Sequence, residues 1–251
     1  MHPILFQIGP FTVYSYGFMV ALGTLIATFL AARHGARNGI DFDDIVDLIF
    51  WVVVWGLIGG RLLYVFLNMT DYRDNFFEIL KIYKGGLVFH GSLIFGLISA
   101  LVFIKQHQLS FFKVMDLVIL YVPLAHAFGR IGCFLNGCCF GRPAGFGWGV
   151  IFPHHFIRVH PTQIYSALLL LAIFIILLVI DRKKKFNGEI FCAYLILYGL
   201  MRFFIEFLRG DNPVVISFLS LFQFISIFLF FLGVGLYIYL ARKSKKRKNI
   251  E

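Results

Sequence analysis

The chain has 251 residues, of which 60% are hydrophobic and only 14% are charged, and its formal net charge is +10 at pH 7. Its mean hydropathy of +0.85 places it among membrane proteins rather than soluble ones. In a soluble protein the positive charge would suggest nucleic acid as a partner. In a membrane protein it is first a signal of topology, so we expect membrane lipid as a partner and no nucleic acid.

The apolar residues gather in segments that approach or exceed the roughly 20 residues needed to cross a bilayer. They predict an all-α integral membrane protein, a single polytopic domain with seven transmembrane helices. Residues 8–14 read as a turn and a short extended piece before the first span. Segment 114–129 contains Pro123 and His126, so it could be a kinked span or a re-entrant hairpin. The predicted spans are 12–32, 45–67, 87–104, 114–129, 163–180, 189–208 and 214–240.

The distribution of lysine and arginine predicts the orientation. With the N-terminus outside and the C-terminus inside, 14 of the 23 Lys and Arg residues fall in inner loops or in the basic cytoplasmic tail 241–251, in agreement with the positive-inside rule. If 114–129 were a re-entrant hairpin, the basic residues 182–185 and the basic tail would not both lie on the side of the membrane that the early loops require. We therefore favour a full crossing followed by an extracytoplasmic loop, 130–162. The outer side holds Arg73, Lys81, Lys84, Arg130, Arg142, Arg158 and Arg209.

This topology gathers unusual polar residues at the outer ends of the spans. Tyr198, Arg202 and Glu206 are spaced four residues apart and therefore share one helix face. Each such residue could have a structural role alone, because arginines snorkel to headgroups and tyrosines anchor at the interface. Their convergence on one side nevertheless indicates a site in the outer leaflet. The other members of this group are Tyr16, Arg61, His90 and Arg130.

The residue types in this group suggest a reaction at a phosphate. Arginine carries a permanent planar charge that matches phosphate, so Arg130 and Arg202 predict binding of a phospholipid headgroup. Histidine can exchange a proton near neutral pH, which makes His90 a candidate base. Charge stabilisation beside a base suits a reaction in which a phosphate-bearing group leaves.

Residues 129–142 read GRIGCFLNGCCFGR and hold three of the four cysteines. Cys133, Cys138 and Cys139 could be nucleophiles, because nearby arginines lower the pKa of a thiol, or they could be ordinary small buried residues. They form no paired CxxC framework, and two adjacent cysteines are a poor zinc spacing. We therefore expect a packing role for these three cysteines and for Cys192, and no metal site.

Several short motifs occur along most of the chain in the order of one known family. They are Tyr16-Gly17; residues 85–91 (GGLVFHG); Gly129-Arg130-Ile-Gly132, Asn136-Gly137 and Gly141-Arg142; residues 160–165 (HPTQIY); and Tyr198-Gly199 with Arg202 and Glu206. Together these motifs are highly specific. On them, the chain resembles the prolipoprotein diacylglyceryl transferases of bacterial inner membranes.

The resemblance implies an enzyme that transfers the diacylglyceryl group of phosphatidylglycerol to the lipobox cysteine of a prolipoprotein signal peptide and releases glycerol phosphate. It implies no metal or organic cofactor, and an inner-membrane site that faces the outer leaflet. The expected catalytic residues are His90, Arg130, Arg202 and Tyr16; the expected phosphatidylglycerol-binding residues are Arg130, Arg202, Gly141 and Asn136; and Tyr198, Glu206 and Arg61 are expected to support them.

The chain departs from the family pattern at three positions. Cys133 stands where the family usually has asparagine, Cys138 where it usually has an acidic residue, and Ser92 where a second glycine usually follows His90. No functional role therefore carries over to these cysteines. Two other functions remain open: an outer-leaflet anion or lipid transporter or binding protein, which inverted repeats would favour, and a membrane thiol oxidoreductase that uses the cysteines.

Overall fold

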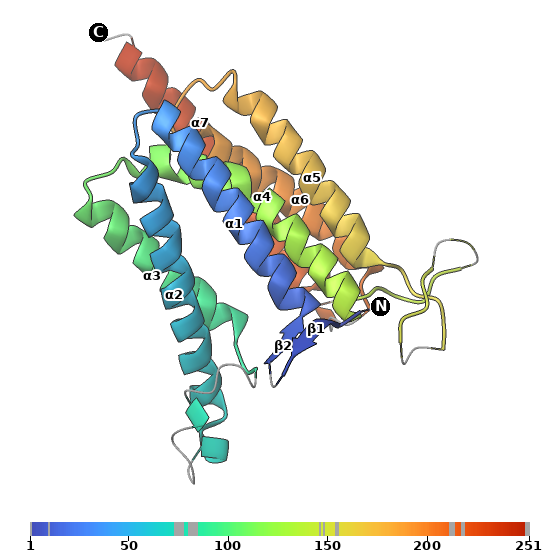
Figure 1. Cartoon of the computed structure of the whole chain (residues 1–251). Coiled ribbons are helices and arrows are strands. Elements are labelled where there is room, and N and C mark those ends of the chain that lie inside the picture. Colours follow the sequence, from blue (N-terminus) through green and yellow to red (C-terminus); the bar gives the residue numbers. More distant parts are fainter. Residues whose placement is uncertain are drawn as a thin grey trace. The chain divides into compact units, whose positions relative to one another are not determined.

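Seven long helices dominate the computed structural model (Figure 1), which describes residues 2–9, 11–72, 78–79, 85–145, 147, 149–153, 156–210, 214–216 and 219–248. All seven are long and apolar enough to cross a membrane, which confirms the predicted all-α, seven-span membrane protein. They are α1 (Ser15–Arg37), α2 (Phe42–Leu67), α3 (Phe89–Gln106), α4 (Phe111–Asn136), α5 (Thr162–Asp181), α6 (Glu189–Leu208) and α7 (Leu221–Lys248).

The ends of α4 and α7 differ from the predicted spans. The segment predicted as 114–129 is the middle of one 26-residue helix with Pro123 inside it, so the hairpin alternative is wrong. Arg130 consequently lies within α4 and not in the loop after it. α7 begins at Leu221 and continues to Lys248, through most of the predicted tail. A helix satisfies its backbone internally, so it can outlast the apolar stretch that marks its span.

Some residues of the predicted loops and tail lie outside the described part of the chain. These are Arg73, Lys81 and Lys84 of the predicted outer side, residues 146, 148, 154 and 155 of the predicted extracytoplasmic loop, and residues 249–251 of the tail.

The chain divides into two compact units, which we describe separately. One unit comprises Met1–Ala31 and Met115–Glu251, and the other comprises Ala32–Val114. The uniform hydropathy of the chain gives no sign of this division.

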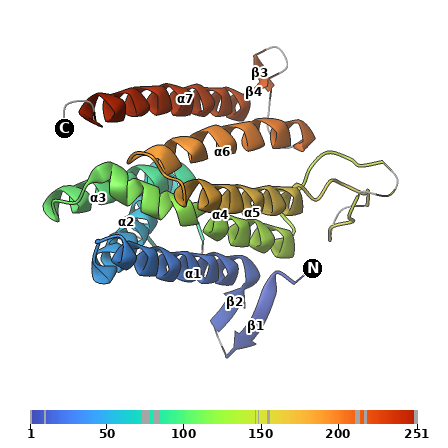
Figure 2. The same ribbon diagram turned by 90° about the horizontal axis from the view of Figure 1, so that it is seen from above.

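The larger unit begins with a short antiparallel hairpin of β1 (Ile4–Ile8) and β2 (Phe11–Tyr14), which corresponds to the predicted turn and extended piece before the first span. The backbone N–H of Ser15 donates to the Pro3 carbonyl at 2.9 Å and joins this hairpin to the start of α1. At the other end of the unit, β3 (Val214–Ile216) and β4 (Leu219–Ser220) pair just before α7. Within the unit, α6 packs against both α7 and α5 (Figure 2).

Small residues let α1 and α4 approach closely, a common device between membrane helices. A Cβ atom added at Gly23 would lie 2.6 Å from the Cβ of Phe128, and one at Gly132 would lie 3.2 Å from the Cα of Tyr16. The first turn of α1 therefore lies directly beside the last turns of α4.

A buried carboxylate joins α4 to the start of α6. Asp116 accepts the backbone N–H groups of Gly188 at 2.6 Å and Phe191 at 2.9 Å, and it pairs with Lys184 at 2.9 Å. An acidic group at a helix N-terminus satisfies donors that have no partner within the helix. This interaction connects α4, which carries Arg130, to α6, which carries Arg202. It lies far from both arginines in the sequence.

The smaller unit is built around the packing of α2 against α3. Glycines again set the distance: a Cβ atom at Gly91 would lie 2.8 Å from the Cβ of Leu63, and one at Gly59 would overlap the Phe95 ring. The short 3₁₀ helix η1 (Met69–Tyr72) follows α2. Gly91 directly follows His90, so this contact fixes the start of α3.

Candidate functional site

Seven of the predicted site residues belong to the larger unit, and α4 and α6 bring several of them together. Arg130 Nε donates a hydrogen bond to His126 Nε2 at 3.2 Å. A guanidinium has no acceptor, so this imidazole nitrogen must accept. The His126 and Tyr198 rings lie 5.9 Å apart between centroids. The two helices therefore meet at His126.

The sequence pattern around His126 predicts only a possible kink, so His126 is a site residue that the sequence-based prediction lacks. A signal was available, because a histidine inside an apolar span is uncommon and usually has a specific partner. It also lies four residues before Arg130, a spacing that puts both side chains on one helix face.

The face of α6 that the spacing predicts is present in the structure. Arg202 Nη2 lies 2.9 Å from Glu206 Oε2, and the Ser220 hydroxyl donates to Glu206 Oε1 at 2.7 Å. The Arg202 guanidinium also lies over the Phe222 ring, 4.9 Å from its centroid, where the ring face attracts a cation. Glu206 is buried; one of its carboxylate oxygens pairs with Arg202, and the other accepts from Ser220 and so holds the carboxylate in place.

Arg130 differs from Arg202 in how its charge is compensated. The two arginines are close enough to act on each other electrostatically, and both act on His126. Arg202 has Glu206 as its counter-ion, whereas no carboxylate of the described residues pairs with Arg130. The site therefore carries a net positive charge in apolar surroundings, an arrangement that favours a bound anion.

Tyr16 lies beside this charge, at the first turn of α1. Its backbone approaches α4 at Gly132, and its side chain acts electrostatically on Arg130 and on the three neighbouring cysteines. The side chain is 46% exposed. It is therefore available to a molecule that reaches Arg130.

The segment after α4 passes between the end of α6 and the residues before α5, and only glycine fits at its centre. The N–H of Gly141 donates to His160 O at 2.8 Å, and the N–H of Arg142 donates to Leu208 O at 2.8 Å. A Cβ atom at Gly141 would lie 2.7 Å from Thr162 Cγ2 and 2.9 Å from His160 Cβ. Gly141 and Arg142 also line a groove of about 430 Å³.

The HPTQIY motif holds the turn between α4 and this segment. The Thr162 hydroxyl donates to Cys139 O at 2.9 Å, and Gln163 Nε2 donates to Cys138 O at 2.6 Å. Both donors are buried in the first turn of α5. The motif therefore has a positioning function that its sequence alone does not reveal.

Asn136 is the last residue of α4, and its side chain is exposed. Gly137 follows with a φ of 75°, a conformation that ends helices and favours glycine. The structure accounts for this Asn-Gly pair as a helix end. It places Asn136 six residues after Arg130, and the predicted role of Asn136 in binding remains a prediction.

The three cysteines of this region lie together: the sulfur atoms of Cys133, Cys138 and Cys139 are all within 4.8 Å of one another. Hydrogen bonds from the Cys133 and Cys138 thiols lower the pKa of Cys139, and the charges of Arg209 and Arg130 lower it further, against the effect of burial. The influence of arginine expected from the sequence is therefore present at Cys139.

The smaller unit holds the two remaining predicted residues, Arg61 and His90. Arg61 is 6% exposed and does not snorkel to the surface. It donates to the carbonyls of Ile79 at 2.8 Å and Gly85 at 2.7 Å, with further bonds at 3.1 Å to Gly86 and at 2.8 Å to Glu78. His90 is exposed in the first turn of α3, so Arg61 organises the chain that leads to it.

The structure thus defines a multi-pass membrane protein with arginines set among its helices. The sequence model of the family described as prolipoprotein diacylglyceryl transferase matches residues 3–239. The phosphatidylglycerol–prolipoprotein diacylglyceryl transferase of Clostridium tetani is 39% identical over 239 residues, which are 93% of this chain and 96% of that protein. The chain belongs to the prolipoprotein diacylglyceryl transferase family, as its motifs predicted.

Two further relatives carry the same name and match over nearly their full length. That of Clostridioides difficile is 34% identical over 100% of both chains, and that of Synechocystis is 36% identical over 96% of this chain and 91% of the relative. The match therefore extends through both compact units and does not depend on one motif.

Replacement of Gly141 by alanine tests the packing of the segment after α4. We expect Gly141→Ala to destabilise the purified protein by roughly 1–3 kcal/mol, the usual cost of overpacking, because the new methyl group has no space. Thermal unfolding in detergent measures this change. The matched control is Gly145→Ala, since a Cβ atom there meets nothing within 4 Å. Equal midpoints for the two variants would contradict the packing described here.

Proposed function

We propose that this chain is a phosphatidylglycerol–prolipoprotein diacylglyceryl transferase. The relatives that match it over nearly their whole length carry that name. In the proposed reaction the lipobox cysteine thiolate attacks the carbon of the diacylglyceryl group that is bonded to a phosphate oxygen. A carbon–sulfur bond forms, the carbon–oxygen bond to phosphate breaks, and glycerol phosphate leaves. The thioether product is the first intermediate of lipoprotein maturation.

The proposed location is the bacterial inner membrane, with the N-terminus outside, the C-terminus inside and the site facing the outer leaflet. The excess of Lys and Arg in the assigned inner loops supports this orientation. Seven crossings are consistent with it, because an odd number of spans puts the two ends of a chain on opposite sides.

The unbalanced charge at Arg130 is the observation that supports the headgroup site best. Arg130 hydrogen-bonds a neutral group, His126, and it acts electrostatically on Arg202. The phosphate of phosphatidylglycerol supplies the missing negative charge. As phosphate becomes the leaving group, its charge grows, and fixed arginines stabilise the transition state more than the ground state.

The remaining predicted residues have supporting roles in this proposal. Glu206 orients Arg202 through the 2.9 Å ion pair, and Tyr16 positions the headgroup beside Arg130. Gly141 and Asn136 contribute to the binding surface. His90 accepts the thiol proton, and Arg61 holds the segment before it. Tyr198 packs beside His126.

A transporter or binding protein would use the same arginines without chemistry. Broken helices near the membrane midplane are typical of many transporters, whereas α4 and α6, which carry the arginines, are continuous over 26 and 20 residues. We therefore favour the transferase.

Removal of either arginine should abolish phosphate stabilisation while leaving the fold intact. We expect Arg130→Ala and Arg202→Ala each to lower the rate of diacylglyceryl transfer by about 100-fold or more, measured as thioether formation on a lipobox peptide. Arg182→Ala, an exposed arginine at the end of α5, is the control and should retain the full rate. Full activity of purified Arg130→Ala enzyme would refute the phosphate assignment.

The pH dependence of transfer tests His90 as the base. A neutral imidazole can accept the thiol proton and an imidazolium cannot, so the wild-type rate should fall once the pH is low enough to protonate the base. We expect His90→Asn to reduce the rate and to remove that limb of the profile. If rate and profile stay unchanged, another group deprotonates the thiol.

A further inference from the structure

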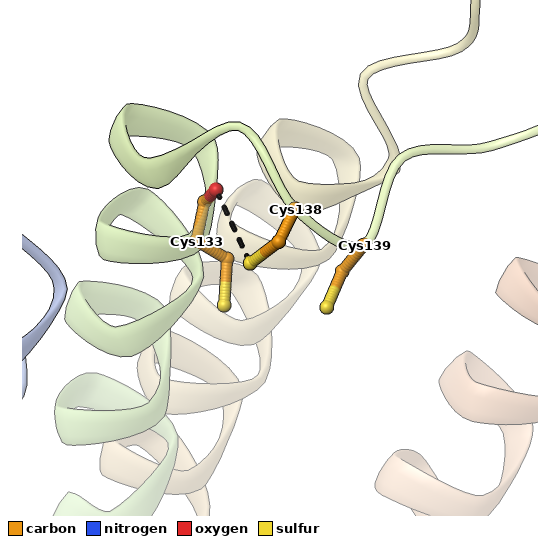
Figure 3. A group of neighbouring side chains, drawn as sticks. All are labelled: Cys133, Cys138 and Cys139. Carbon is orange, nitrogen blue, oxygen red and sulfur yellow. Dashed lines mark hydrogen bonds between the residues drawn. The ribbon is translucent and has the colours of Figure 1, made fainter. Parts of the chain in front are cut away.

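Cys133, Cys138 and Cys139 form a compact cluster at the end of α4. Figure 3 shows the side chains of Cys133, Cys138 and Cys139, which come from the last turn of the helix and the first residues after it. Their sulfur atoms lie within 4.8 Å of one another. None forms a disulfide, and the proposed transfer reaction uses none of them.

The way α4 ends explains why Cys133 and Cys138 meet. The N–H of Gly137 donates to Phe134 O at 3.1 Å, and the N–H of Cys138 donates to Cys133 O at 3.1 Å. This pair of bonds is the Schellman motif, in which the side chains at the positions of Cys133 and Cys138 commonly contact each other. The Cys138 sulfur also lies 3.7 Å from the Cys133 carbonyl oxygen.

The third cysteine is brought in by its own backbone conformation. Cys139 has a φ of 63°, which is uncommon for a residue other than glycine and occurs often at functional sites. Thr162 and Gln163 hold the carbonyls of Cys139 and Cys138 from the first turn of α5. The cluster is therefore fixed on both sides before any ligand binds.

We propose that Cys133, Cys138 and Cys139 bind a soft metal ion of the zinc type through three thiolates, with a fourth coordination position open. Zinc–thiolate bonds of about 2.3 Å place the sulfur atoms of a tetrahedral site roughly 3.8 Å apart. Sulfur atoms already within 4.8 Å reach that geometry by small rotations of their side chains. Sites with three protein ligands leave the fourth position to water or another donor.

The local charge is compatible with such a site. Three thiolates and one divalent ion carry a net charge of −1, and Arg130 lies three residues before Cys133, so the two share a helix face. The adjacency of Cys138 and Cys139 in the sequence is a poor spacing for zinc ligands. In the structure, however, the end of α4 and the positive φ of Cys139 bring the three sulfur atoms together.

Metal content of the purified full-length protein tests this proposal independently of transfer activity. After reduction, one equivalent of Zn²⁺ is added, unbound metal is removed, and zinc is measured by mass spectrometry. We expect about one zinc per chain in the wild type and in Cys192→Ser, whose cysteine is buried in α6. The triple variant Cys133→Ser, Cys138→Ser, Cys139→Ser should retain none. Equal zinc in the triple variant and the wild type, or no zinc in the reduced wild type, would overturn the site.

A second measurement on the wild type avoids reliance on the folding of the triple variant. Cd²⁺ bound to thiolates absorbs in the ultraviolet in proportion to the number of sulfur ligands, and we expect the absorption of three. Zn²⁺ should also protect all three cysteines from alkylation. Alkylation of all three at an unchanged rate in the presence of Zn²⁺ would contradict the proposal. The proposal would also be contradicted by a protein that binds no metal when reduced and forms a disulfide within the cluster when a mild disulfide oxidant is added, the result that favours a thiol oxidoreductase.

Discussion

Permanent positive charge within membrane-length helices is the constraint on which this structure depends. A guanidinium in apolar surroundings must be compensated, because its desolvation is costly. The chain compensates three arginines in three ways. Backbone carbonyls surround Arg61, a carboxylate pairs with Arg202, and a neutral imidazole accepts from Arg130. The partner of each arginine indicates whether that arginine has a structural role or is a candidate for binding a ligand.

Carbonyls satisfy the donors of Arg61 and leave it with a structural task, the support of the chain before His90. Glu206 cancels the charge of Arg202 and fixes its position, and Ser220 in turn fixes Glu206. Of these three arginines, Arg130 is the one whose hydrogen-bond partner among the described residues is a single neutral side chain, that of His126. We propose an anionic headgroup as its partner, because its phosphate would supply the missing negative charge and would gain charge as it leaves.

Much of the fold could be predicted from the sequence, because hydropathy reports directly which segments cross a membrane. The ends of helices could not. Hydropathy falls at Arg130, yet the backbone bonds of α4 continue to Asn136, where a glycine with positive φ ends them. The division into two compact units was also hidden, since both units contain apolar helices of membrane-spanning length.

The site was predictable where one helix determines it, as for Tyr198, Arg202 and Glu206, whose spacing places them on one face. It was less predictable where separate elements meet. Nothing local in the sequence shows that Thr162 and Gln163 hold the backbone of Cys138 and Cys139, or that His126 accepts from Arg130. The cysteines show the same limit, because their spacing argued against a cluster that the turn then creates.

Mass analysis of a lipobox peptide incubated with the purified enzyme and phosphatidylglycerol shows directly whether the chain transfers the diacylglyceryl group. We expect the peptide to gain the mass of one diacylglyceryl group at its cysteine, with release of glycerol phosphate in equal amount. An unmodified peptide in the presence of well-folded enzyme would contradict it.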